Sequence, residues 1–304
     1  MIYKFQAILK TLVWGTENWV LSGVMGNETK VVGGPADGKT LNELYGGEFP
    51  LLIKFIDAKK DLSIQVHPND EVAQQRHGCK GKTEMWYMID TAPGAHLLAG
   101  LSKEITKEDY VKLVEEGRIT EVLADHKVAP GDVYFLPAGR IHAICGGCYL
   151  AEIQETSDIT YRIFDYNRPG LDGKPRQLHT QEAKDVIDYK VYPSYKTDYV
   201  WKENAEMEVV RCKHFVTSVY ELTQPFRLTG ASTRTPLSGL SVDDSCSRKE
   251  DFLVVIGLEG AGHVVGQDGS RMPIHAGEAV LVMGEKQISF EPESPKLKLM
   301  TTHL

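Results

Sequence analysis

The sequence predicts a mainly β protein, in which a larger jelly-roll domain with a short helical insertion precedes a smaller β-sandwich. Two observations lead to this prediction. Short runs rich in β-branched and aromatic residues recur along the chain, and Gly and Pro residues typical of turns bound them. In the first domain, the strand-like runs are residues 51–58, 62–67, 83–89, 95–100, 132–136 and 149–166.

The insertion at residues 102–125 has helical rather than strand-like spacing and is expected to form two short helices. Thr106 and Asp109 have the pattern of an N-terminal cap, and the apolar residues that follow recur at helical intervals. Gly117 is expected to separate the two helices. Residues 180–188 are a candidate for a further helix.

The character of the sequence changes near residue 191. Residues 191–199 are rich in Tyr, Pro and Lys and are interpreted as a linker. We therefore expect one domain over residues 1–190 and a smaller β domain over residues 191–304. The strand-like runs of this second domain are residues 209–222, 251–258, 262–265, 279–283 and 296–302.

Composition restricts the function classes. The chain has 304 residues, 42% hydrophobic and 25% charged, which is ordinary for a globular protein of this size. No apolar run is long enough to span a membrane, and the N-terminal residues lack the layout of a signal peptide. A net charge of −8 argues against nucleic acid as a partner, but a few convergent Lys and Arg residues would suffice for a phosphorylated small molecule.

The five cysteines are an odd number, which favours reduced thiols and a cytoplasmic protein. Cys145 and Cys148 form a C-x-x-C pair that could in principle bind zinc or act as a redox centre. A structural zinc site would need a second pair, and a redox motif would open a helix. The intervening Gly-Gly suits a hairpin turn, which is the interpretation we favour.

Residues 131–142 carry most of the functional information. They match the pattern G-x5-P-x-G-x2-H, the second half of the cupin metal motif, in which a sharp turn delivers His142 to the mouth of a small β-barrel. The first domain is therefore predicted to be a metal-binding cupin, and the second to be a cupin-like sandwich. His263 and His275 in the second domain have no accompanying ligands, so that domain is expected to be structural.

Upstream residues complete a candidate metal site. Gln65 and His67 are two apart on a strand and share a face, as do Lys82 and Glu84 on the next strand-like run. With His142 they would provide two imidazoles, one carboxylate and one amide oxygen. This set suits one zinc ion with a position left for water or substrate, although iron and manganese accept the same ligand types.

The run at residues 149–166 offers groups for anion binding and proton transfer. Strand alternation places Glu152 with Gln154 and Thr156 on one face, followed by Arg162, if no bulge intervenes. These residues could simply be the solvated face of an amphipathic strand. Alternatively, Arg162, Arg168 and Lys82 could form the positive end of a pocket for a phosphate or an enediolate.

Taken together, these blocks resemble the type I mannose-6-phosphate isomerases in their short bacterial form. The resemblance covers about the first 190 residues well and the second domain weakly. It implies a zinc-dependent aldose–ketose isomerase that interconverts mannose 6-phosphate and fructose 6-phosphate through a cis-enediol. The matching blocks are Trp14-Gly15 with residues 17–22, and residues 50–70, 81–87, 131–144 and 152–168.

The resemblance also implies roles for individual residues. Arg162 matches the family's catalytic arginine, Glu152 and Lys82 match pocket residues, and Arg168 stands where longer members have a lysine that can meet the phosphate. The residues that match the family's zinc ligands are Gln65, His67, Glu84 and His142.

Two other functions compete with this one. A metal-dependent cupin oxygenase is disfavoured because Gln65 stands where many oxygen-activating cupins have an imidazole, and no organic cosubstrate motif is visible. A non-catalytic sugar-phosphate-binding cupin would bind the sugar phosphate without turnover in the presence of zinc.

Overall fold

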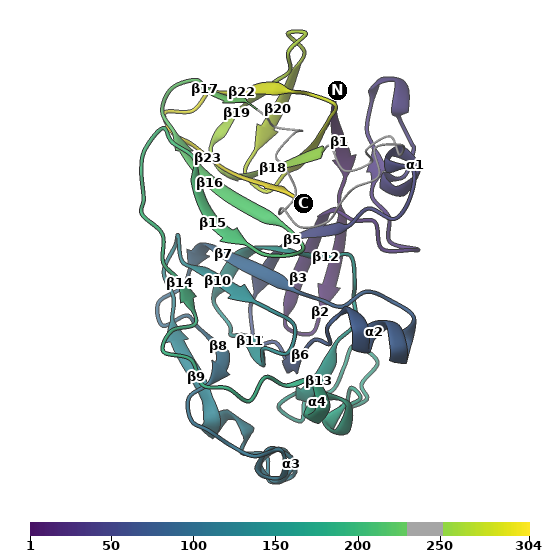
Figure 1. The fold of residues 1–304 in the computed structure, drawn as a ribbon, viewed down its shortest axis with the longest axis vertical. Coiled ribbons are helices and arrows are strands. Elements are labelled where there is room, and N and C mark those ends of the chain that lie inside the picture. The colour runs from purple at the N-terminus through teal and green to yellow at the C-terminus, as the bar shows by residue number, and fades with distance from the viewer. Residues whose placement is uncertain (230–251) are drawn as a thin grey trace. The chain divides into compact units, whose positions relative to one another are not determined.

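The computed structural model describes residues 1–229 and 252–304 and has the predicted mainly β architecture (Figure 1). The chain forms two compact units that are discontinuous in sequence. We name them the central unit, Ile8–Val24 with Pro50–Thr197, and the terminal unit, Met1–Ala7 with Met25–Phe49 and Asp198–Leu304.

A single boundary at residue 190 therefore does not describe these units. Strand β1 (Ile2–Gln6) pairs antiparallel with β21 (Ala279–Met283), which ties the N-terminal residues to the terminal unit. At the other end, β14 (Lys196–Thr197) pairs with a strand of the central unit, so most of the predicted linker belongs there. Both departures result from pairing between segments far apart in sequence, which local composition does not reveal.

The central unit contains two sheets. The seven-stranded sheet has the order β14-β10-β7-β12-β5-β3-β2, and the five-stranded sheet has the order β13-β6-β11-β8-β9. Their remaining strands are β2 (Ile8–Leu12), β3 (Gly15–Leu21), β5 (Leu51–Ala58), β6 (Ile64–Val66), β7 (Glu84–Thr91), β8 (His96–Leu101), β9 (Leu123–Lys127), β10 (Val133–Leu136), β11 (His142–Ile144), β12 (Cys148–Glu155) and β13 (Tyr161–Phe164).

Strand alternation decides which side chains enter the space between these two sheets. Trp86 and Leu150 of the larger sheet share one buried cluster with Leu97 and Ile144 of the smaller sheet. The intervening residues of the smaller sheet point the other way and form a second cluster beneath the helices. That cluster includes Ile64, Val66, Ala143, Cys145, Tyr161 and Ile163.

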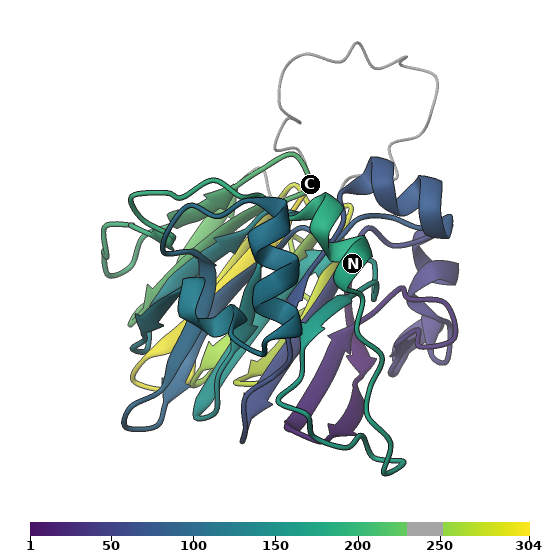
Figure 2. The ribbon, with the colours of Figure 1, turned by 90° about the horizontal axis from the view of Figure 1, so that it is seen from below.

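Helices cover the outer face of the five-stranded sheet. They are α3 (Lys107–Glu115), the 3₁₀ turn η2 (Ile119–Val122) and α4 (Thr180–Val186). Figure 2 shows α3 and α4 next to each other, and α4 also packs against β13. The predicted helical insertion is thus confirmed as one helix and one 3₁₀ turn. A further helix, α2 (Asp70–His77), was not predicted.

The predicted cap of α3 is present as a complete capping box. The Thr106 hydroxyl accepts a hydrogen bond from the Asp109 backbone N–H at 3.0 Å, and the Asp109 carboxylate accepts one from the Thr106 N–H at 3.0 Å. Thr106→Ala should therefore lower the free energy of unfolding by about 0.5–2 kcal/mol. Urea unfolding of the variant beside Thr106→Ser, which keeps the hydroxyl, measures this; equal losses in both variants would contradict a capping role.

The predicted strand at residues 149–166 is in fact two strands in different sheets. Strand β12 belongs to the larger sheet and β13 to the smaller one, so the chain bends between them. The buried Gln154 amide supports this bend by donating hydrogen bonds to the carbonyls of Glu155 (2.9 Å) and Ser157 (2.5 Å). Gln154 is therefore a structural residue.

The C-x-x-C pair also lies at a crossing between sheets. Gly146 and Gly147 form a turn, as expected, but the strands on either side of it belong to different sheets and do not pair as a hairpin. Both thiols are free and buried, Cys145 in the cluster beneath the helices and Cys148 in the cluster between the sheets. Burial raises the pKa of both thiols, that of Cys148 to about 11, which disfavours the thiolate that redox chemistry needs.

The terminal unit has two sheets of its own, with the orders β15-β16-β23-β18-β21-β1-β4 and β17-β22-β19-β20. Its core is apolar and includes Tyr220, Phe290 and Leu299. No helix in the described residues is long and apolar enough to cross a membrane. The other elements of this unit are β4 (Lys30–Val31), η1 (Gly34–Ala36), α1 (Leu41–Tyr45), β15 (Met207–Arg211), β16 (Val216–Leu222), β17 (Phe226–Thr229), β18 (Phe252–Glu259), β19 (Ala261–Val265), β20 (Arg271–His275), β22 (Gln287–Pro292) and β23 (Leu297–His303).

Candidate functional site

Three of the predicted metal ligands meet at one point in the central unit. Glu84 begins β7, His142 begins β11, and His67 follows β6 directly. The side chains offer donor atoms that all lie within 4.8 Å of one another. Glu84 Oε1 is 3.2 Å from His142 Nε2, and Glu84 Oε2 is 3.5 Å from His67 Nε2.

The Pro-x-Gly turn of the sequence motif, residues 137–139, links the strand of His142 to His67. Gly139 adopts a φ of 89°, and a Cβ at this position would lie 2.7 Å from the Val186 carbonyl oxygen, so only glycine fits without rearrangement. Its backbone N–H donates a 2.8 Å hydrogen bond to the His67 carbonyl. The turn that delivers His142 is therefore hydrogen-bonded directly to His67, the other imidazole of the candidate centre.

Backbone carbonyls orient both imidazoles. His142 Nδ1 lies 2.8 Å from the Arg140 carbonyl oxygen, and His67 Nδ1 lies 2.9 Å from the Ile159 carbonyl oxygen. An Nδ1–H donated to a carbonyl leaves the Nε2 lone pair facing the shared centre, which is the usual arrangement of metal-binding histidines. Burial lowers the pKa of both rings, which favours the neutral form that binds metals.

The donor atoms at this centre fit a bound cation. His67 Nε2 and both carboxylate oxygens of Glu84 are buried without a hydrogen-bond partner among the described residues. Burial, followed by the nearby Glu152 charge, raises the pKa of Glu84, which reflects the cost of enclosing this carboxylate. A divalent ion bound here would stabilise the ionised Glu84 carboxylate and so offset the free-energy cost of its burial. Two imidazoles and a carboxylate are a ligand set that zinc accepts.

Gln65 lies beside this centre, as predicted. It is paired with His142 in the β6–β11 register, and its amide nitrogen lies 3.4 Å from His142 Nε2. A half-turn of the amide group would exchange nitrogen for oxygen at this position. Gln65 could then provide the fourth ligand that the sequence predicts.

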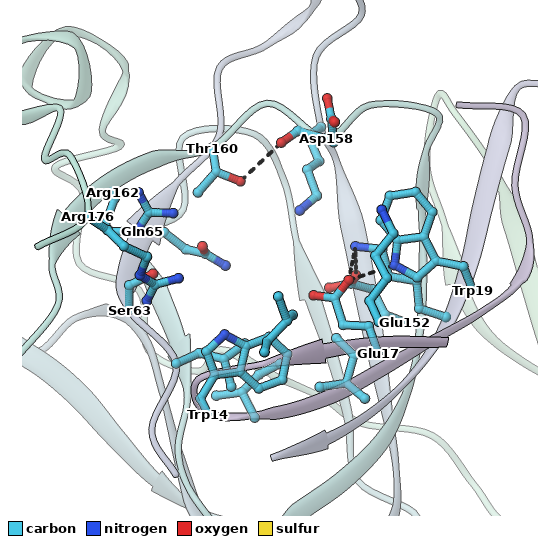
Figure 3. A pocket seen from close by; sticks show the side chains of 17 residues that line it. Trp14, Glu17, Trp19, Ser63, Gln65, Glu152, Asp158, Thr160, Arg162 and Arg176 are labelled. Atoms are coloured by element: carbon cyan, nitrogen blue, oxygen red, sulfur yellow. Dashed lines mark hydrogen bonds and ion pairs between the residues drawn. The ribbon is translucent and has the colours of Figure 1, made fainter. Parts of the chain in front are cut away.

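A pocket of about 250 Å³ opens next to these residues, between the two sheets (Figure 3). Trp14 lies along one side of it, and the remaining lining is largely polar. The lining residues are Lys10, Leu12, Trp14, Glu17, Trp19, Lys54, Ile56, Leu62, Ser63, Gln65, Lys82, Ile144, Glu152, Asp158, Thr160, Arg162 and Arg176.

Arginines line one side of the pocket, and carboxylates accompanied by lysines line the other. Figure 3 shows Arg162 and Arg176 near Gln65 on one side, and Glu17 and Glu152 on the other. A substrate with an anionic group would therefore have a preferred orientation in the pocket.

The carboxylates of the second side surround a buried lysine that the sequence analysis missed. Lys54 Nζ lies 2.9 Å from Glu152 and 3.8 Å from Glu17, and the Trp86 indole N–H donates to Glu152 at 2.9 Å. Burial alone would raise the pKa of Glu152, but the Lys54 and Lys82 charges lower it to about 2. Glu152 is therefore ionised at neutral pH.

Lys82 connects the pocket with the candidate metal centre. It lines the pocket, and its Nζ lies 3.4 Å from Glu84 Oε2. The predicted sharing of one face by Lys82 and Glu84 agrees with this contact, and both side chains are buried.

The Arg162 side chain is held by one backbone carbonyl. Its Nη1 donates a 3.0 Å hydrogen bond to the Gln177 carbonyl, and the Arg162 backbone N–H donates a 3.1 Å bond to His179 Nδ1. It makes no ion pair with the described residues, and its Nε is buried without a hydrogen-bond partner among them. Burial, followed by the Arg176 charge, lowers its pKa.

Arg168, a candidate for the positive end of the pocket, does not line it. Its Nε donates to Asp165 at 3.0 Å and its Nη1 to the Asp61 carbonyl at 2.5 Å, so its position is that of a structural residue. The arginine that lines the pocket beside Arg162 is instead Arg176, which the sequence analysis missed. Arg176 lies in an irregular segment, where no strand period predicts its direction.

His263 and His275 of the terminal unit are each paired with a carboxylate. His263 Nδ1 lies 3.2 Å from Glu293, and His275 Nδ1 lies 3.1 Å from Glu278. Their positions agree with the expectation that they are ordinary residues of strands β19 and β20.

Similarity to known proteins agrees with this geometry. Residues 8–93 match the family model described as phosphomannose isomerase type I, catalytic domain. The mannose-6-phosphate isomerase ManA of Bacillus subtilis is 31% identical over 289 residues, which cover 86% of this chain and 86% of that protein. The probable mannose-6-phosphate isomerase GmuF of the same bacterium is 36% identical over 226 residues, 70% of each chain.

Solved structures agree in fold. The crystal structure of the mannose 6-phosphate isomerase from Bacillus subtilis has a TM-score of 0.86 at 26% identity and covers 100% of this chain and 99% of that chain. A putative mannosephosphate isomerase from Archaeoglobus fulgidus has a TM-score of 0.76 at 17% identity, with coverage of 100% and 97%. This chain belongs to the type I mannose-6-phosphate isomerase family.

Proposed function

We propose that this protein interconverts mannose 6-phosphate and fructose 6-phosphate, with one zinc ion held by His67, Glu84, His142 and Gln65. The observation that carries the proposal is the convergence of buried donor atoms beside a pocket that has arginines on one side and carboxylates paired with a lysine on the other. An aldose–ketose isomerase needs these parts: an electrophile for the sugar oxygens, groups that move a proton, and a positive site for developing charge.

The residues of the pocket divide these tasks. When bound, zinc supplies Lewis acidity toward the sugar oxygens. Arg162 stabilises the negative charge that develops as the C2 proton leaves and the cis-enediol forms. Glu152, which is ionised, takes the C2 proton and returns it to C1, while Lys82 donates a proton to O1 and recovers one from the O2 hydroxyl. The C2 proton lost and the C1 proton gained balance, so no external oxidant or reductant is needed.

The direct test is metal analysis of the purified protein followed by NMR of mannose 6-phosphate in D2O. We expect fructose 6-phosphate to appear with deuterium at C1, and deuterium at C2 of the recovered mannose 6-phosphate. Binding without turnover in the zinc-loaded protein would favour the sugar-phosphate-binding alternative. Oxygen consumption would favour an oxygenase.

The location of the metal can be tested from the terminal unit. Because His263 and His275 are paired with glutamates, changing both to alanine should leave the zinc content unchanged. Elemental analysis of the double variant beside the wild-type protein measures this. Loss of stoichiometric zinc would show that the metal is bound in the terminal unit.

A further inference from the structure

Arg176 occupies a position in the pocket that the proposed chemistry does not use. It lies after β13, in the irregular segment before α4, yet it reaches the pocket and lies near Arg162 (Figure 3). An arginine that lines a substrate pocket without a part in the chemical step is a candidate for substrate recognition.

The side chain of Arg176 is held rigidly from behind. Asp165 receives its Nε–H and one Nη2–H, each at 2.6 Å, and this carboxylate is itself 5% exposed. The bidentate pairing fixes the plane of the guanidinium group. Nη1 makes no hydrogen bond with the described residues, so part of the donor capacity of Arg176 is available for a ligand.

Asp165 is shared, so it cannot neutralise the site. Arg168 and Arg176 both pair with it, and Arg162 adds a third positive charge with no ion pair of its own among residues 1–229 and 252–304. Three guanidinium groups around one carboxylate leave this side of the pocket with an excess of positive charge. An anionic group of a ligand would balance this excess.

The two arginines that line the pocket come from different segments. Arg162 is paired with Gln65 in the β13–β6 register, next to the candidate metal centre. Arg176 has no such pairing and enters from a segment outside the sheet. In an open-chain hexose 6-phosphate the phosphate is carried on C6, away from C1 and C2, so the cation that meets the reacting carbons need not be the one that binds the phosphate.

We propose that Arg176, held by Asp165, binds the phosphate group of the sugar phosphate, while Arg162 serves the reacting carbons. This inference rests on the proposed function for the identity of the sugar. It assigns Arg176 to substrate recognition and Asp165 to positioning, and it leaves Arg168 a structural role.

The experiment compares Arg176→Gln with Arg168→Gln, a matched variant that removes the same charge from the same carboxylate partner. Binding of inorganic phosphate is measured by calorimetry, and KM and kcat for mannose 6-phosphate are measured in parallel. Arg176→Gln should weaken phosphate binding and raise KM by about 10- to 100-fold, the range expected for loss of a charge-assisted contact, with kcat changed by less than about threefold.

Arg168→Gln should change phosphate binding by less than about threefold. Arg176→Lys should retain only part of the affinity, because an ammonium group cannot pair with Asp165 and a phosphate in one plane. Zinc content and thermal unfolding identify variants that fail to fold. If Arg176→Gln fails to fold, Asp165→Asn is the second variant: it removes the ion pair that orients Arg176 but keeps the arginine, and it should also weaken phosphate binding.

Each contrary result has a definite meaning. If Arg168→Gln weakens phosphate binding and Arg176→Gln does not, the assignment of Arg176 is wrong. A fall in kcat at unchanged KM in Arg176→Gln would place it in the chemical step instead, and absence of phosphate binding to the wild-type protein would also overturn the inference. Since the calorimetry requires no turnover, it tests the anion site even if the isomerase activity itself is absent.

Discussion

His142→Ala is expected to remove the bound metal and to lower kcat/KM for mannose 6-phosphate by about 10³-fold or more. The variant deletes one of two imidazoles whose Nε2 atoms face the shared centre, and leaves Glu84 buried with fewer partners. A Lewis acid contributes several kcal/mol to stabilising charge on the sugar oxygens, and losing about 4 kcal/mol corresponds to 10³ in rate. Elemental analysis and steady-state kinetics measure the two effects.

His126→Ala is the matched control in the same unit. His126 contacts the Ala99 carbonyl at 3.1 Å and packs against Tyr134, but it does not line the pocket. This variant should keep its zinc and its activity. Full metal content with normal activity in His142→Ala would contradict the proposed centre.

Glu84→Gln separates a metal ligand from a structural ion pair. If the centre is built for a cation, the amide should weaken zinc binding but raise the melting temperature of the metal-free protein, because no charge is then buried there. If Glu84 instead serves mainly to pair with Lys82 and the histidines, the metal-free variant should be less stable than the wild-type protein.

The local sequence pattern predicts that His67, Glu84 and His142 come together, because turns and alternation are local properties. The Pro-x-Gly turn fixes where His142 begins its strand, and a period of two places Gln65 with His67 and Lys82 with Glu84. The strand at Leu51–Ala58 was predicted with the boundaries that the structure has. Each of these depends on fewer than about ten consecutive residues.

The pocket was less predictable because distant segments build it. Arg176 follows no strand period, and the Asp165 carboxylate that holds it stands 11 residues earlier in the chain, with no regular element between them. The pairing of β1 with β21 likewise joins opposite ends of the sequence. Lys54 did carry a usable signal, since a charged residue in the middle of an apolar strand needs a buried partner, and here Glu152 is that partner.

Arg162→Ala is expected to lower kcat by about 100-fold or more while KM changes little. Arg162 faces the pocket next to Gln65, and its guanidinium makes no ion pair within the described part of the chain, so it can meet charge that develops on the substrate. An interaction that stabilises the transition state more than the bound substrate raises kcat, so its loss lowers kcat. Removing one such hydrogen-bond donor lowers kcat by about 10²- to 10³-fold in comparable sites.

Controls distinguish this role from two others. Arg162→Lys should recover only part of the rate, because a point charge cannot replace a planar fork that also donates to the Gln177 carbonyl. Arg76→Ala, which removes an exposed arginine paired with Asp185, should leave kcat and KM unchanged.

Retained zinc in Arg162→Ala would show that the metal centre is intact. A rise in KM with kcat preserved would make Arg162 a phosphate anchor, and wild-type values of both constants would remove it from the catalytic set and leave Glu152 and Lys82 to be tested next.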